Sequence, residues 1–110
     1  MWLNETEAAN KYMNRSWTTQ TALTLVANTE QTVAIASGKY YMTIDSEVDL
    51  KLEFNLLSNT TSITANSPVV VLGGFPETIQ VPQGLVDETT DTLYAHFEST
   101  GNGDVKWVTG

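Results

Sequence analysis

Apolar and polar residues alternate along most of the chain after residue 20. The clearest case is residues 48–56, whose apolar members share one parity: Val48, Leu50, Leu52, Phe54 and Leu56. Successive side chains of a strand point to opposite faces of a sheet, whereas a helix would scatter these residues around its circumference. The segment therefore predicts a strand with one dry face and one wet face.

Shorter runs of the same kind, separated by turn residues, fill the remainder of this region. They lie at residues 23–27, 33–36, 40–44, 79–81, 93–98 and 105–107, and an unbroken apolar run covers 69–72. Turns are indicated by the Gly-Gly-Phe-Pro sequence at 73–76 and by the hairpin signal at 99–104. The polar connection 58–67 has room for one more short strand around Ile63. We therefore expect an all-β domain, a single β-sandwich or jelly-roll-like barrel of about eight short strands.

Residues 1–20 follow a different pattern. Asn4 and Glu7 have the spacing of an N-cap and its partner, which predicts a short helix through Met13. Such a short helix is marginal in water unless it packs against something. Its surroundings supply five candidate partner contacts: Trp2, Leu3, Tyr12, Met13 and Trp17. The sequence therefore predicts an N-terminal arm (1–20) that binds another protein chain, followed by a β-domain (21–110).

Length and charge narrow the classes of protein that fit this pattern. A chain of 110 residues suits one domain. Its formal net charge of −8 argues against nucleic acid or an anionic membrane as partner, since both need a basic surface. The chain has no cysteine, so disulfides, zinc knuckles and thiol chemistry are unavailable to it. No apolar run is long enough for a membrane span and the start lacks a leader pattern, so we expect neither a span nor a secretion signal.

Side chains that could carry catalysis or hold a metal ion are few. The single histidine, His96, falls on the polar parity of its strand without a nucleophile-elbow motif, so we expect a surface or interface residue. Asp45, Glu47 and Asp49 alternate, and in an extended strand they would point the same way, either toward a calcium ion or into solvent. The acidic residues of loop 87–91 offer the same choice. We favour the solvated face for both groups and expect no enzyme activity, no cofactor and no metal.

The aromatic residues leave an alternative open. Three tryptophans and four tyrosines could form a platform on which a sugar ring stacks. For Trp107, packing in the core or at the edge of the last strand competes with this role. Trp2 and Trp17 are better placed as interface anchors, because tryptophan is favoured at binding hot spots.

Two stretches of the chain resemble small structural proteins of tailed phages. The first is residues 23–35, LTLVANTEQTVAI, which is similar to the run that opens the β-domain of such proteins. The second lies within residues 74–107 and includes ETIQVP (77–82), LYAHFES (93–99) and VKW (105–107). Together these two stretches cover a little under half of the chain.

The resemblance implies a capsid decoration (cement) protein or a related virion component. The expected partner is then the major capsid protein, and the expected assembly is a homo-oligomer, in particular a trimer over capsid junctions. Synthesis in the host cytoplasm and a final place on the capsid exterior would follow. The alternative is a carbohydrate-binding or receptor-binding β-module of a head fibre or tail.

Overall fold

The computed structural model describes residues 16–110. Within that range it contains eight strands and one short 3-10 helix, η2. In chain order these elements are β1 (Thr21–Leu25), β2 (Glu30–Ile35), β3 (Tyr41–Ser46), β4 (Leu50–Asn55), β5 (Val69–Val71), β6 (Glu77–Gln80), η2 (Gln83–Leu85), β7 (Leu93–Ser99) and β8 (Gly103–Thr109). None of the helical structure described is long and apolar enough to cross a membrane.

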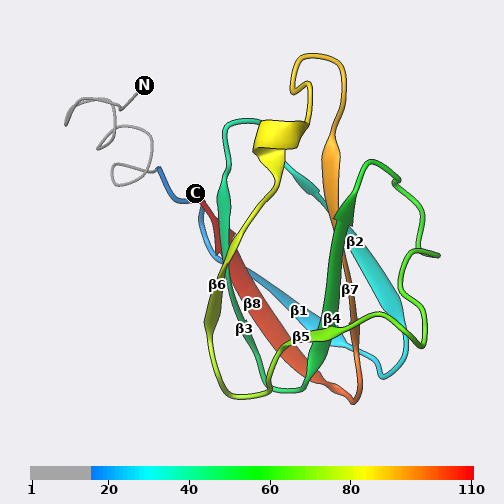
Figure 1. Cartoon of the computed structure of the whole chain (residues 1–110). Coiled ribbons are helices and arrows are strands. Elements are labelled where there is room, and N and C mark those ends of the chain that lie inside the picture. Colours follow the sequence, from blue (N-terminus) through cyan, green and yellow to red (C-terminus); the bar gives the residue numbers. More distant parts are fainter. Residues whose placement is uncertain (1–15) are drawn as a thin grey trace.

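The strands form two four-stranded antiparallel sheets that pack face to face (Figure 1). One sheet has the order β1-β8-β3-β6 and the other has the order β2-β7-β4-β5. This is the strand order of an eight-stranded jelly roll, so the predicted fold class is confirmed. The loops β1–β2, β3–β4, β5–β6 and β7–β8 gather at the lower end in Figure 1, called the loop end below, and η2 lies at the opposite end.

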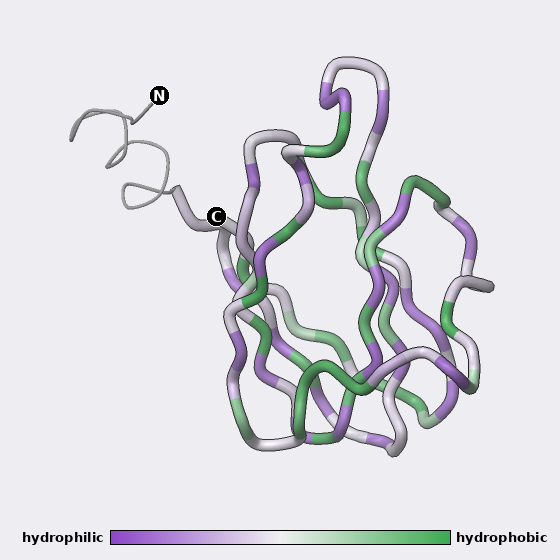
Figure 2. The backbone as a smooth tube through the Cα atoms, in the orientation of Figure 1, coloured by the Kyte–Doolittle hydropathy of each residue, from purple (hydrophilic) through white to green (hydrophobic). Residues whose placement is uncertain are grey.

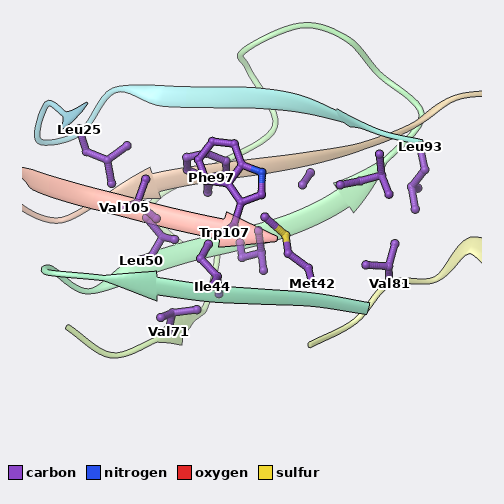
Figure 3. Packing of buried hydrophobic residues seen from close by; sticks show 13 residues of the cluster. Leu25, Met42, Ile44, Leu50, Val71, Val81, Leu93, Phe97, Val105 and Trp107 are labelled. Carbon is purple, nitrogen blue, oxygen red and sulfur yellow. The ribbon is translucent and has the colours of Figure 1, made fainter. Parts of the chain in front are cut away.

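The core lies between the two inner faces. Its buried apolar residues come from both sheets: Leu25, Ile35, Met42, Ile44, Leu50, Leu52, Val71, Val81, Leu93, Ala95, Phe97, Val105 and Trp107. Phe97 of one sheet meets Trp107 of the other edge to face, with ring centroids 5.5 Å apart (Figure 3). Trp107 is 9% exposed, so its assignment to core packing is confirmed.

The strand predicted for residues 48–56 is wrong at both ends. Leu50 and Leu52 are buried as expected, but β4 ends at Asn55 and Leu56 is exposed. Val48 belongs to the preceding turn, because the Ser46 hydroxyl donates to Val48 O at 2.7 Å and bends the chain there. A turn with its own side-chain hydrogen bond thus interrupts an alternation that continues in the sequence.

The connection between β4 and β5 crosses the outer face of its sheet, and we call residues 57–67 the strap (Figure 1). Its backbone bonds to outward-facing side chains: Thr32 Oγ1 donates to Asn59 O at 2.8 Å, and Lys51 Nζ donates to Thr64 O at 3.1 Å. The expected short strand around Ile63 is absent from this segment. Side chains of β2 and β4, rather than a strand ladder, hold the strap in place.

Replacing the central core ring should cost much of the stability. Phe97→Ala should lower the free energy of unfolding by about 3–5 kcal/mol, because it removes a fully buried ring and leaves a cavity. Chemical denaturation measures this difference. Leu85→Ala, at a side chain that is 90% exposed, is the matched control and should change it by less than about 0.5 kcal/mol. Equal effects of the two variants would contradict the assigned core.

Candidate functional site

The first described residues attach the N-terminal segment to the end of β8. The Thr18 N–H donates to Thr109 O, and the Thr109 N–H donates to Thr18 Oγ1, each at 2.9 Å. The Trp17 ring lies over Gly110 so closely that a Cβ built at Gly110 would stand 2.5 Å from the ring. Trp17 nevertheless remains 46% exposed. The side chain is therefore packed against the end of the described chain with nearly half of its surface exposed.

The other four candidate contacts lie outside the described residues: Trp2, Leu3, Tyr12 and Met13. The helix predicted through Met13 lies there as well. Residues 1–15 carry two basic and two acidic side chains, so the entire formal charge of −8 belongs to residues 16–110. The acidity is thus a property of the β-domain, and the N-terminal segment is formally neutral and rich in aromatic residues.

A hollow of about 530 Å³ opens beside the start of β3 and the segment that follows β6. Its walls are formed by Tyr40, Tyr41, Gln80, Val81, Pro82, Gly84 and Leu85. The Val81 N–H donates to Tyr40 O at 2.8 Å, which joins the two sides of the hollow. Tyrosine rings beside an amide can stack on a sugar ring and bond its hydroxyls. The tyrosines were candidates for sugar stacking from the sequence, but only the pairing of β3 with β6 places them next to Gln80.

This hollow and Trp17 lie at the same end of the molecule. Both the Tyr40 and the Tyr41 N–H donate to Gly110 O at 2.9 Å, and Gly110 is the residue that Trp17 covers. Trp17 and the adjacent pair Tyr40 and Tyr41, which are far apart in sequence, are therefore brought together around the end of β8. This cluster is the candidate interaction site that the described residues define most clearly.

The three carboxylates considered for calcium are not brought together. Asp45 lies on β3 opposite Lys106, whereas Glu47 and Asp49 lie in the turn after β3. Glu47 Oε1 accepts from the Asp104 N–H at 2.8 Å, and Asp49 Oδ1 accepts from the Gly73 N–H at 2.9 Å. No set of three or more His, Asp or Glu side chains in residues 16–110 is placed to hold a metal ion. The idea that they share one strand face is wrong, because the chain turns after Ser46.

The acidic residues of the loop 87–91 accept hydrogen bonds that stabilise this loop. Asp87 Oδ1 accepts hydrogen bonds from the hydroxyl and the N–H of Thr89, at 2.7 and 3.1 Å, and these bonds hold the pKa of Asp87 below its ordinary value of 3.8. Glu88 Oε1 accepts from the Gly38 N–H at 2.7 Å. These carboxylates therefore tie the β6–β7 loop to itself and to the β2–β3 turn.

The expectation that His96 lies at the surface is wrong. Its side chain is completely buried on the outer face of β7, beneath the strap. Nδ1 lies 3.1 Å from Glu30 Oε2 and 3.1 Å from Thr32 Oγ1. Because the Thr32 hydroxyl donates to Asn59 O, both neighbours of Nδ1 are acceptors, which places a ring proton on Nδ1. Nε2 is buried without a hydrogen-bond partner among the described residues.

Glu30 links this histidine to the strap. Its carboxylate accepts from the Ser62 N–H at 3.2 Å and also from the Ile63 N–H. His96 lies on the outer face of β7, as its position in the alternation predicted, but the strap, a segment distant in sequence, covers that face. The only signal in the sequence was the length of the polar connection 58–67, since a long loop in a small domain must lie over some surface.

Known proteins offer no guide to this site: no family, curated protein or solved structure matches the chain. The similarity to phage structural proteins expected from the sequence gains no support from these comparisons. A fold such as the jelly roll serves many unrelated functions, so the function has to be argued from the surfaces themselves.

Removing the Glu30 carboxylate should release the strap. Glu30→Ala leaves the Ser62 and Ile63 N–H groups without their acceptor and removes one acceptor from His96, at a cost of about 1–3 kcal/mol. Hydrogen exchange at both amides should accelerate while the amides of β3 and β8 keep their protection.

Two further variants calibrate this experiment. Glu30→Gln keeps one acceptor oxygen and should fall between the native protein and Glu30→Ala, whereas Glu77→Ala, at an exposed side chain, should change neither amide. Native protection of Ser62 and Ile63 in Glu30→Ala would show that the strap does not depend on this carboxylate.

Proposed function

We propose that the protein is a non-enzymatic structural component of a phage virion that binds the capsid and stabilises it, as a decoration or cement protein does. The observation that carries this proposal is the position of Trp17. It is fixed against Gly110 and still 46% exposed, at the point where the chain joins the aromatic residues of the first fifteen positions. A tryptophan held in this way is pre-organised to serve as an anchor.

The β-domain supplies supporting arguments. It is a jelly roll, an architecture used by viral capsid and lectin domains, and it needs no disulfide because its core comes from both sheets. The formal charge of −8 lies entirely on this domain. An acidic body suits a place on the outside of a particle, away from the packaged nucleic acid.

In this proposal the partner is the major capsid protein, and the site on this chain comprises Trp2, Leu3, Tyr12, Met13 and Trp17. The protein acts as a homo-oligomer, a trimer by analogy with the proteins it resembles, after synthesis in the host cytoplasm. The neutral N-terminal segment makes the contact with the capsid, and the acidic β-domain faces the solvent.

Deletion of residues 1–15 tests the proposal, because it spares the Thr18–Thr109 bonds and the contact of Trp17 with Gly110. The full-length protein should co-sediment with assembled heads of the phage that encodes it, and the truncated protein should not. The circular dichroism spectrum and melting temperature of the two should agree, since every described β-contact remains.

Point variants in the full-length chain complete the design. Trp17→Ala and, separately, the double variant Trp2→Ala/Tyr12→Ala should each weaken binding to heads by at least about tenfold, as loss of hot-spot aromatics does. Asn10→Ala/Asn14→Ala, in the same segment, is the matched control and should bind as the native protein does. Undiminished binding by the truncated protein, or no binding by the full-length protein, would refute the proposal.

The hollow beside Tyr40 and Tyr41 favours a second candidate, a carbohydrate-binding or receptor-binding module of a head fibre or tail. Its tyrosines and the Gln80 amide are the kinds of group that hold a sugar. Trp107 cannot serve as the platform, because it is buried in the core.

A glycan array checks this second candidate. If it is correct, the protein binds a defined set of glycans, and Tyr41→Ala weakens that binding roughly tenfold through the loss of one stacked ring. Tyr94→Ala, at a tyrosine of β7 that does not line the hollow, is the matched control. An array without bound glycans would exclude this candidate.

A further inference from the structure

An uncharged apolar strip runs along β5 and the turn after it. Residues 67–76, SPVVVLGGFP, contain no charged side chain. Four of their apolar residues are exposed: Val69 by 44%, Val70 by 38%, Leu72 by 55% and Phe75 by 66%. Figure 2 shows hydrophobic colouring along this part of the chain at the loop end of the molecule. Large apolar side chains exposed so near one another in the chain are candidates for contact with a partner.

β5 is also the last strand of its sheet. It pairs with β4 on one side, and no strand of residues 16–110 pairs with its other side. Natural edge strands are commonly protected by charged side chains, and β5 carries none. Pro68 and the bulge at Leu50 and Lys51 keep the strand to three residues, so a docked segment would form few backbone bonds. Apolar contacts with Leu72 and Phe75 would have to supply much of the binding energy.

The turn that presents Phe75 is rigid. The Gly73 N–H donates to Asp49 Oδ1 at 2.9 Å, and the Gly74 N–H donates to Ser46 O at 2.8 Å. A Cβ at Gly73 would stand 2.7 Å from Glu47 O, and Gly74 has a φ of 81°, so both positions need glycine. Such a pre-organised turn loses little conformational entropy when a partner binds it.

The charges around the strip are acidic. Glu47 and Asp49 lie in the turn that packs on Gly73, and Glu77 follows the strip directly; all three are exposed. Lys51, which lies opposite Val69, is engaged with Thr64 O. A second copy of the chain docked through the same strip would bring two acidic rims together. A partner with lysine or arginine beside its own apolar segment complements the rim instead.

We infer that β5 and the turn after it form a docking site for an extended, uncharged segment of another protein that is flanked by basic residues. The segment adds to the free edge of β5, and its apolar side chains cover Leu72 and Phe75. This site lies at the loop end, opposite the Trp17 cluster, and does not depend on the N-terminal segment. It gives the protein a second surface, in addition to the proposed capsid contact.

A peptide titration of the full-length protein tests this inference. The probe is a short synthetic peptide of alternating valine and threonine with lysines at both ends, followed by NMR chemical shifts. It should shift the resonances of β5 and of residues 72–75, and adding salt should weaken binding, because exposed charges contribute. A counterpart with glutamates in place of the lysines should bind at least about tenfold more weakly, through repulsion from the acidic rim.

Variants locate the site. Val70→Lys and, independently, Phe75→Ser should each weaken peptide binding at least about tenfold, while Val26→Lys should not. Val26 is the matched control because it is an exposed valine at the same end, in the β1–β2 turn. Phe75→Ser lies outside any strand and preserves the test if Val70→Lys perturbs folding. Equal binding of both peptides, absence of binding, or self-association that Val70→Lys abolishes would each overturn the inference.

Discussion

The contact between the two sheets at Phe97 and Trp107 is the interaction on which the remaining structure depends. The two rings come from β7 and β8, which are consecutive in the chain but belong to different sheets. Each is a central strand, because β7 lies between β2 and β4, and β8 lies between β1 and β3. β8 continues from Trp107 to Thr109 and Gly110, which hold Thr18 and Trp17. The packing that buries one tryptophan therefore also fixes the position of the other, and it places the two tyrosines of the hollow beside the same chain segment.

The two sheets differ in how much of their outer face is covered by other parts of the described chain. The strap covers the outer face of β2-β7-β4-β5 and encloses His96 with Glu30. The outer face of the other sheet has no comparable cover in the described chain, and its threonines bond to one another, as Thr43 and Thr78 do at 2.9 Å. Both faces are polar in sequence, but only the second remains a solvent surface. The two interaction surfaces that we propose lie at the two ends of the sandwich, away from the strap.

The fold class could be predicted because period-two alternation follows directly from strand geometry, and it predicted buried residues such as Leu50 and Leu52 correctly. Burial of His96 could not be predicted, because it depends on where a distant loop lies. The separation of Asp45 from Asp49 was missed for a local reason, the hydrogen-bonded turn at Ser46. The hollow required Tyr40 and Tyr41 to meet residues 80–85, a pairing that only the sheet topology fixes.

The hydrogen bonds that hold the strap also determine which of its residues can vary during evolution. Glu30, Thr32 and Lys51 bond mainly to backbone groups of the strap, which every amino acid except proline provides in full. The exposed side chains of Ser58 and Thr60 are therefore free to diversify, whereas the three sheet residues beneath the strap are constrained. Among descendants of this sequence, variation would accumulate in the covering segment, as is usual for loops, while the polar sheet positions beneath it would stay as constant as core positions.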